Sequence, residues 1–214
     1  MPDRQALDVL EAIHSTRSMR YLKPDPIPDD VVWALLDAAI RGPTGGNSQG
    51  WGWVVVRDAE VKRQIGEWYL EGWERNYGVH REQELAGQGS LGRVNFLAAD
   101  HLARHIAEAP VWIFAVLRGV GQSANPRAGG SIYGAVQNLM LAARAFGIGS
   151  TLTALYGAHE EEVQRLLGLP DDATTMGLIP LGYPARGDFS QPRRRPVEEV
   201  VHWERWGAQR ARED

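Results

Sequence analysis

The chain has 214 residues, no cysteine and a formal net charge of -4, and its 43% hydrophobic and 23% charged residues are typical of a globular protein. This length suits one sizeable domain with a full core. The lack of cysteine excludes disulfides, thiolate metal sites and cysteine nucleophiles, and the charge gives no general attraction to nucleic acid or to an anionic membrane. No apolar run reaches the length of a membrane span, and the charged N-terminus has no signal-peptide core, so we expect a cytoplasmic protein.

The N-terminal part contains two expected helices separated by a proline-rich segment. Apolar spacing predicts the first helix from about residue 6 to residue 16, and this helix leads into TRSMRYL. The segment KPDPIPDD cannot be helical at its prolines, and Asp29 or Asp30 is a natural N-cap for a second helix that ends near Arg41. The run WGWVVV farther along predicts a strand.

The glycine-rich loop GPTGGNSQGW, residues 42–51, joins that second helix to that strand. Gly45 and Gly50 have the spacing of a phosphate-binding P-loop, but Trp51 and Gly52 stand where Lys and then Ser or Thr are required. The dinucleotide-binding fingerprint also fails, because it needs a strand before the loop and a helix after it. Two interpretations stay open: a long surface turn, or a loop whose polar side chains hydrogen-bond the edge of a flat heterocycle.

Helices and strands alternate through the middle of the chain. We expect helices at about residues 59–77, 93–108 and 131–147. The last of these is apolar on nearly every side and should be central. The run APVWIFAVLRG predicts a strand covered on both faces. The polar, glycine-rich segments 78–92 and 119–130 are typical of mobile connections.

The C-terminal part adds two more regular elements and a long tail. The stretch GSTLTALYG is expected to be strand or loop, AHEEEVQRLLG a surface helix and ATTMGLIPLGYP a strand. The tail from about residue 184 to residue 214 has no core of its own, so we expect it to lie along this protein or along a partner copy. The alternation of helices with three or four strands predicts a single domain over residues 1–214, of the α+β or α/β class.

Arginines are concentrated at two places that are distant in the sequence. The segment RSMR contains Arg17, Ser18 and Arg20, and RRRP contains Arg193, Arg194 and Arg195. Converging guanidinium groups and neutral donors would bind a phosphate dianion. The alternative for each segment is a solvated basic patch. A nucleic-acid surface is not expected, because the longer run has only three residues and is not interleaved with aromatic side chains.

Other candidate groups do not form a recognisable catalytic pattern. His101 and His105 are four residues apart, but the HExxH motif is absent and no third ligand stands out, so no metal is expected. Glutamates 160–162 form a charge run on an expected surface helix, and Ser131 does not lie in a G-x-S-x-G motif. If the protein is an enzyme, a cofactor is therefore expected to supply the chemistry, and no protein side chain is assigned as catalytic.

Three stretches in this order resemble the nitroreductase family of FMN-dependent oxidoreductases: STRSMRYLKPDPIPDDVVWALLDAAIRGPTGGNSQGWGWVVVRD, GAVQNLMLAARAFGIGS and GLIPLGYPARGDFSQPRRRPVEEVVHW. The form TGGNSQGW and the closing VVHW are similar to an actinobacterial branch of that family. The resemblance implies an α+β fold with three α/β/α layers around a mainly antiparallel sheet. It also implies a homodimer with two FMN sites at the interface and a domain-swapped C-terminal tail that wraps the partner.

The resemblance assigns cofactor contacts to particular residues. Arg17 and Ser18 resemble the phosphate and ribityl ligands, Arg20 resembles the cation beside the pyrimidine end of the flavin, and the arginines of the tail resemble a second phosphate clamp. The glycine-rich loop corresponds to the loop that reaches the flavin from the second subunit. The complete set of expected FMN-binding residues is Arg17, Ser18, Arg20, Pro43, Thr44, Gly45, Asn47, Gln49, Leu152, Thr153, Ala154, Leu155, Gly182, Arg193 and Arg194.

The implied activity is transfer of hydride from NADPH or NADH to FMN N5 and then, by a ping-pong scheme, to an electron-poor acceptor such as a nitroaromatic or a quinone. Residues 78–92 are where we expect the lid that determines specificity. Other reactions of the same superfamily stay open: dehalogenation, breakdown of the flavin, and reduction that uses a deazaflavin donor. Two alternatives of other classes are a non-catalytic FMN-binding sensor and a basic-tail nucleic-acid binder.

Overall fold

The computed structural model describes residues 6–119 and 128–211, so most of the expected connection 119–130 lies outside the described residues. Four strands form one antiparallel sheet in the order β1-β2-β4-β3. The strands are β1 (Trp51–Val56), β2 (Val111–Arg118), β3 (Gly149–Ser150) and β4 (Ala173–Gly182). The α-helices are α1 (Val9–Ser15), α2 (Asp29–Ala39), α3 (Ala59–Asn76), α4 (Arg81–Leu85), α5 (Arg93–His105), α6 (Tyr133–Ala145) and α7 (Glu160–Leu167).

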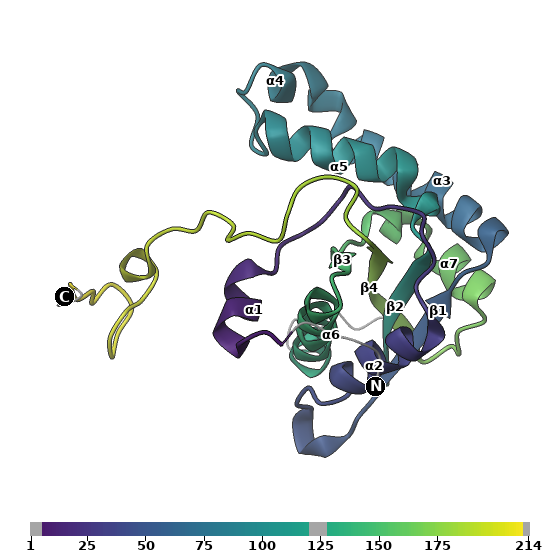
Figure 1. The fold of residues 1–214 in the computed structure, drawn as a ribbon, viewed down its shortest axis with the longest axis horizontal. Coiled ribbons are helices and arrows are strands. Elements are labelled where there is room, and N and C mark those ends of the chain that lie inside the picture. Colours follow the sequence, from purple (N-terminus) through teal and green to yellow (C-terminus); the bar gives the residue numbers. More distant parts are fainter. Residues whose placement is uncertain (1–5, 120–127, 212–214) are drawn as a thin grey trace.

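Helices cover both faces of the sheet (Figure 1). Strand β2 is central, and its side chains alternate between the two faces. Ile113 and Leu117 belong to a core shared with α2 and α6, whereas Trp112 and Phe114 belong to a core shared with α3 and α5. The apolar run of β2 is therefore buried on both sides, as expected from the sequence. The fold has an α+β composition and three α/β/α layers, as the sequence resemblance implied.

One local expectation was wrong. The N-cap of α2 is Pro28, and neither Asp29 nor Asp30 caps the helix through its side chain. Both carboxylates lie in the first turn, where their negative charge interacts favourably with the positive end of the helix dipole. The segment 78–92 contains the helical turn η2 (Gly78–His80) and α4, and Glu84 is buried, whereas its expected mobility stays a prediction.

The segment after α1 extends the sheet beyond β3. The Met19 amide donates to the Ser150 carbonyl at 2.9 Å, and the Lys23 amide donates to the Tyr183 carbonyl at 2.8 Å. The Ala185 amide in turn donates to the Tyr21 carbonyl at 2.9 Å. These bonds place residues 17–23 between β3 and the start of the C-terminal tail.

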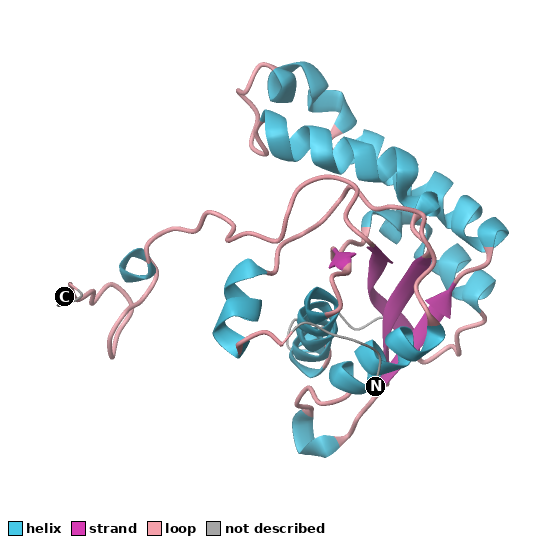
Figure 2. Ribbon diagram, in the orientation of Figure 1, coloured by secondary structure: helices cyan, strands magenta, loops and turns pink. Residues whose placement is uncertain are grey.

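The tail then leaves the body of the molecule, and its described part, up to residue 211, contains one short helical turn, η6 (Val197–Glu199) (Figures 1 and 2). Its apolar side chains are largely exposed, including Trp206 at 90%. The tail therefore has no core within one chain, as the sequence indicated. In the described ranges, 6–119 and 128–211, no helix has both the length and the hydrophobicity to cross a bilayer.

Candidate functional site

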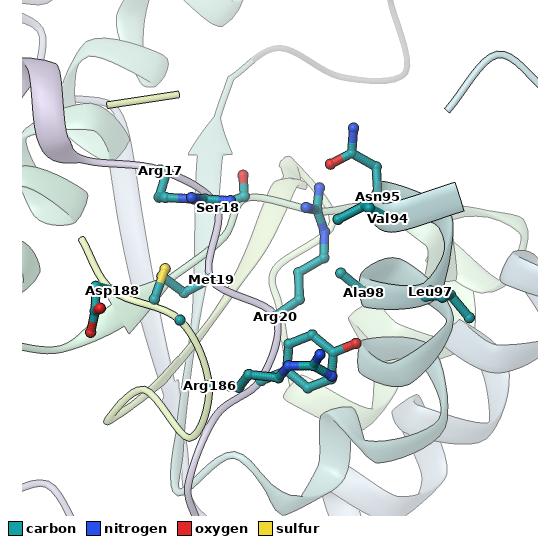
Figure 3. A pocket seen from close by; sticks show the side chains of 12 residues that line it. Arg17, Ser18, Met19, Arg20, Val94, Asn95, Leu97, Ala98, Arg186 and Asp188 are labelled. Atoms are coloured by element: carbon teal, nitrogen blue, oxygen red, sulfur yellow. The ribbon is translucent and has the colours of Figure 1, made fainter. Parts of the chain in front are cut away.

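A cavity of about 280 Å³ lies between residues 17–21, the first turns of α5 and residues 186–188 of the tail (Figure 3). Its walls include Arg17, Ser18 and Arg20, which the sequence analysis selected. Backbone pairing of the 17–23 segment with β3 and with the tail explains why these residues meet residues 186–188. The structure thus joins the N-terminal site residues to a segment about 170 positions away in the sequence.

Close packing of the 17–23 segment requires two glycines beneath it. A Cβ at Gly149 would lie 2.8 Å from the Cβ of Met19, and a Cβ at Gly182 would lie 2.9 Å from the Cβ of Leu22. Both distances are too short for ordinary side chains, so neither position admits a larger residue without movement of the segment. Gly182 does not line the cavity, because it packs against Leu22. The expected contact of Gly182 with a flavin stays a prediction.

Arg17 and Arg20 supply positive charge to the cavity from different directions. The Arg17 Nη1 donates to the Ser190 hydroxyl at 3.0 Å, which ties the segment to the tail. The Arg20 side chain extends toward Asn95 on α5 (Figure 3). Burial lowers the pKa of Arg20, the interaction with Tyr69 raises it, and the charge of Arg17 lowers it. An arginine still keeps its proton at neutral pH, so Arg20 is a half-buried, permanent cation.

The segment 152–155 is anchored against α3 and β4. The Thr153 amide donates to the Leu178 carbonyl at 3.0 Å, and the Thr153 hydroxyl is 2.8 Å from the Tyr69 hydroxyl. Tyr69 is 3% exposed, and burial raises its pKa, so the phenol stays protonated at neutral pH. Leu155 follows so close to α3 that a Cβ at Gly72 would lie 1.9 Å from the Leu155 carbonyl oxygen. These contacts fix the position of the 152–155 backbone. Tyr69, which contacts the Thr153 hydroxyl, also interacts electrostatically with Arg20.

The glycine-rich loop has an unusual backbone and lies away from this cavity. Gly46, Asn47 and Gln49 all have positive φ, at 59°, 54° and 50°, and the Gln49 amide donates to the Thr44 hydroxyl at 3.1 Å. The loop between α2 and β1 is at the lower end of the molecule in Figure 1, and none of its residues lines the cavity. One chain therefore does not bring Pro43, Thr44, Gly45, Asn47 or Gln49 together with Arg17.

The tail arginines also occupy a different place. Arg193 and Arg194 line a second, open hollow of about 630 Å³ together with Ile13 and His14 of α1. Both arginines are exposed, and the Arg194 Nη1 donates to the Arg193 carbonyl at 3.2 Å. They are therefore not part of the first cavity in one chain, although Ser190, three residues before Arg193, contacts Arg17.

Several residues at the cavity were not found from the sequence. Tyr21, Asn95, Arg186 and Asp188 line it. Asn95 belongs to a helix that was predicted, but nothing in a single sequence shows which face of that helix borders a cavity. Arg186 and Asp188 lie in the ARGD stretch, which gave no signal because isolated charges are common on surfaces.

The two histidines of α5 pack as a stack of rings. His101 lies against Tyr21 with ring centroids 4.3 Å apart, and His105 lies against His101 at 4.4 Å. The His105 Nδ1 is 2.8 Å from a Glu108 carboxylate oxygen. Burial, followed by the charge of His105, lowers the pKa of His101. In the part of the chain that the structure describes, no three His, Asp or Glu side chains gather as metal ligands would.

Comparisons with known proteins agree with this fold. The sequence model described as "Nitroreductase family" matches residues 13–183, and the chain belongs to that family. It is similar to an "NADH dehydrogenase" of Thermus thermophilus, with 31% identity over 204 residues that cover 92% of this chain and 96% of the relative. "Iodotyrosine deiodinase 1" of Rattus norvegicus is 26% identical over 182 residues, covering 83% of this chain and 62% of the relative.

A solved structure has the same fold. The crystal structure of a nitroreductase with bound FMN from Bacteroides fragilis superposes with a TM-score of 0.68 and 22% identity, covering 93% of this chain and 100% of that chain.

Proposed function

We propose that the protein is an FMN-dependent oxidoreductase that takes electrons from reduced nicotinamide and reduces electron-poor acceptors such as nitroaromatics and quinones. The observation that carries the proposal is the convergence of Arg17, Ser18 and Arg20 on one cavity. Family membership, FMN in the Bacteroides fragilis structure and the name of the Thermus thermophilus relative support the choice of cofactor and donor.

The residues at the cavity fit a phosphorylated flavin. Arg17 offers a guanidinium for the phosphate dianion, and Ser18 offers a neutral donor for the phosphate or ribityl chain. Arg20 would lie beside the pyrimidine end of the flavin, and the backbone of residues 152–155 would face the central ring. The loop 43–49 of a second copy would complete the site, which makes the functional unit a homodimer.

When bound, FMN would supply the chemistry by accepting hydride from NADH or NADPH and passing reducing equivalents to the acceptor. The task of the chain is to hold the reactants and to provide a favourable electrostatic environment. Arg20 contributes a permanent charge that favours the negatively charged, reduced state of the cofactor. Tyr69 fixes the Thr153 side chain, so the nearby backbone amides keep a constant position. No protein nucleophile or metal is needed for this role.

Flavin-binding measurements test the assignment of the phosphate end. Replacing Arg17 by Ala should weaken FMN by about tenfold or more, since a charge-assisted hydrogen bond to phosphate is lost. Riboflavin, which lacks the phosphate, should be much less affected. Arg194→Ala should follow the same pattern if the tail arginines clamp the phosphate, and Arg165→Gln, an exposed change on α7, is the control. Equal weakening of FMN and riboflavin would contradict the assignment.

The similarity to iodotyrosine deiodinase favours reductive dehalogenation as a second candidate. A reduced deazaflavin is a further candidate donor, which suits an actinobacterial branch. A sensor that only binds FMN is a non-enzymatic alternative.

Parallel assays distinguish these candidate functions. They use NADH, NADPH and a reduced deazaflavin as donors, followed by product analysis with nitroaromatic, quinone and halogenated-phenol acceptors. Halide release without reduction of the nitro or quinone acceptors would replace the proposed reaction, and conversion of the flavin itself would indicate flavin breakdown.

A further inference from the structure

We propose that Arg186 is an anion-binding residue of the cavity, and that it recognises an acidic group on the molecule that shares the cavity with the cofactor. The acidic group is a carboxylate, sulfonate or phosphate, carried by the electron acceptor or by the nicotinamide donor. The inference deepens the proposed function and rests on it, because it assumes that a donor or an acceptor enters this cavity.

The backbone on both sides of Arg186 is held in place. Residues 183–185 pair with residues 21–23 through the Lys23–Tyr183 and Ala185–Tyr21 hydrogen bonds, at 2.8 and 2.9 Å. Gly187 then has a φ of 80°, a left-handed conformation that turns the chain directly after Arg186. The guanidinium is therefore carried by an ordered part of the tail, before the tail leaves the body of the molecule (Figure 1).

The Arg186 guanidinium lies over an aromatic ring and is not neutralised by a carboxylate of the described residues. The Arg186 Cζ lies 5.3 Å from the centre of the Tyr21 ring, and that ring lies against His101 on α5. A cation–π contact does not use up the hydrogen-bonding capacity of a guanidinium, so its N–H groups stay available for a planar anion. Among the described residues, no carboxylate is within ion-pairing distance of Arg186, whereas exposed arginines such as Arg63 and Arg75 are paired with neighbouring glutamates.

The cavity wall has a net positive charge, and Arg186 is the part of it that is not assigned to the cofactor. Arg17, Arg20 and Arg186 all line it, against one carboxylate, Asp188. In Figure 3 Arg186 and Arg17 lie toward opposite ends of the displayed segment, with Arg20 between them, and Asp188 lies beside Met19. With Arg17 and Arg20 assigned to the cofactor, Arg186 is left at the other end of the cavity. A negative group on a second ligand is the partner that its charge and geometry favour.

The test compares matched ligands that differ in charge, using the FMN-loaded protein and its Arg186→Gln variant. For the acceptor, 4-nitrobenzoate is compared with neutral 4-nitrobenzamide. For the donor, NADH and NADPH are compared with uncharged 1-benzyl-1,4-dihydronicotinamide. In the variant we expect the KM of the anionic member of one pair to rise by about tenfold, since one charged hydrogen bond is lost. The KM of the neutral member should change less than about twofold, and the pair that responds identifies the source of the anion.

A binding measurement separates failure of this inference from failure of the proposed function. Calorimetric titration of the loaded protein with 4-nitrobenzoate and with NAD⁺ requires no turnover, and one of the two should bind about tenfold more weakly to Arg186→Gln. Arg165→Gln is the control, because Arg165 is an exposed arginine on α7 that lines neither hollow. If affinity and KM for every charged ligand are the same in the wild type and in Arg186→Gln, the inference is overturned. A chain that binds no flavin refutes the proposed function instead.

Discussion

Arg20 is the residue whose environment says most about the electrostatics of the site. It is a half-buried cation in a cavity wall, close to Tyr69 and to a second arginine. A positive charge kept partly away from water acts over a longer range than one that is fully solvated. Its partial burial costs free energy, which a bound anion would offset.

Replacing Arg20 by Ala should lower the reduction potential of the bound flavin, because the reduced, negatively charged state loses a nearby cation. A decrease on the order of 30 mV or more is expected, equivalent to about 1.4 kcal/mol for a two-electron couple. Spectroelectrochemical titration of the wild type, Arg20→Lys and Arg20→Ala measures it. Arg20→Lys keeps the charge and should retain most of the potential. An identical potential in all three proteins would remove Arg20 from the flavin.

The sequence selected Arg17, Ser18 and Arg20, which line the cavity, because they form a compact motif with a recognisable resemblance. It did not select Tyr21 or Arg186, because their place at the cavity depends on a backbone pairing between segments about 160 residues apart. Such pairing leaves no local pattern in either segment. The functional meaning of an isolated arginine therefore depends on the structure.

At the scale of elements, the close approach of η5 (Leu155–His159) to α3 holds the 152–155 segment. A methyl group at Gly72 would clash with the Leu155 carbonyl, so Gly72→Ala should destabilise the fold by about 2 kcal/mol or more through forced movement of the backbone. Gly66→Ala on the same helix is a matched control, since its Cβ would make only an ordinary contact, 3.5 Å from Ala107. That control should gain up to about 1 kcal/mol from helix propensity. Urea denaturation measures both, and equal behaviour of the two variants would contradict the packing argument.

Helices α3, α4 and α5 are joined through Asp100, whose side chain is 13% exposed. Burial raises the pKa of Asp100, but hydrogen bonds from Arg104, Arg81 and Trp73 outweigh it and lower the pKa to about 2, from 3.8. The ionised form of Asp100 is therefore more stable in the folded chain than in the unfolded chain. Its contribution of about 2 kcal/mol is present above pH 4 and is lost as the pH falls toward 2.

Asp100→Asn should remove this part of the acid sensitivity. Between pH 4 and pH 2 the variant should lose about 2 kcal/mol less than the wild type, measured from urea unfolding at each pH. At pH 7 the variant should be less stable, because Arg81 and Arg104 lose a charged partner. Parallel acid-unfolding curves for the two proteins would show that Asp100 does not titrate in this way.

Most helices and strands could be predicted because their apolar periods are clear, as in β2 and α3. The N-cap of α2 could not, since three adjacent residues, Pro28, Asp29 and Asp30, can each start a helix, and tertiary packing decides among them. The turns within residues 78–92 were hidden by polar composition, yet Glu84 and its bond to the Leu91 amide give them a fixed shape.

At the scale of the whole molecule, the proposed function requires more than one chain supplies. The loop with Thr44, Asn47 and Gln49 contributes no residue to the cavity wall, and Trp203 and Trp206 of the tail are exposed. A second copy would account for both features, by covering the tail and by bringing its own loop to the cavity. The homodimer therefore stays a prediction that follows from the proposed function.

The most direct test of the account is a visible absorption spectrum of the purified protein, followed by anaerobic addition of NADH or NADPH. We predict flavin bands that bleach with at least one donor and return when a quinone or a nitroaromatic compound is added. A colourless protein that takes up no added FMN would contradict the account, and a flavin-containing protein that no reduced donor bleaches would leave it with a binding role only.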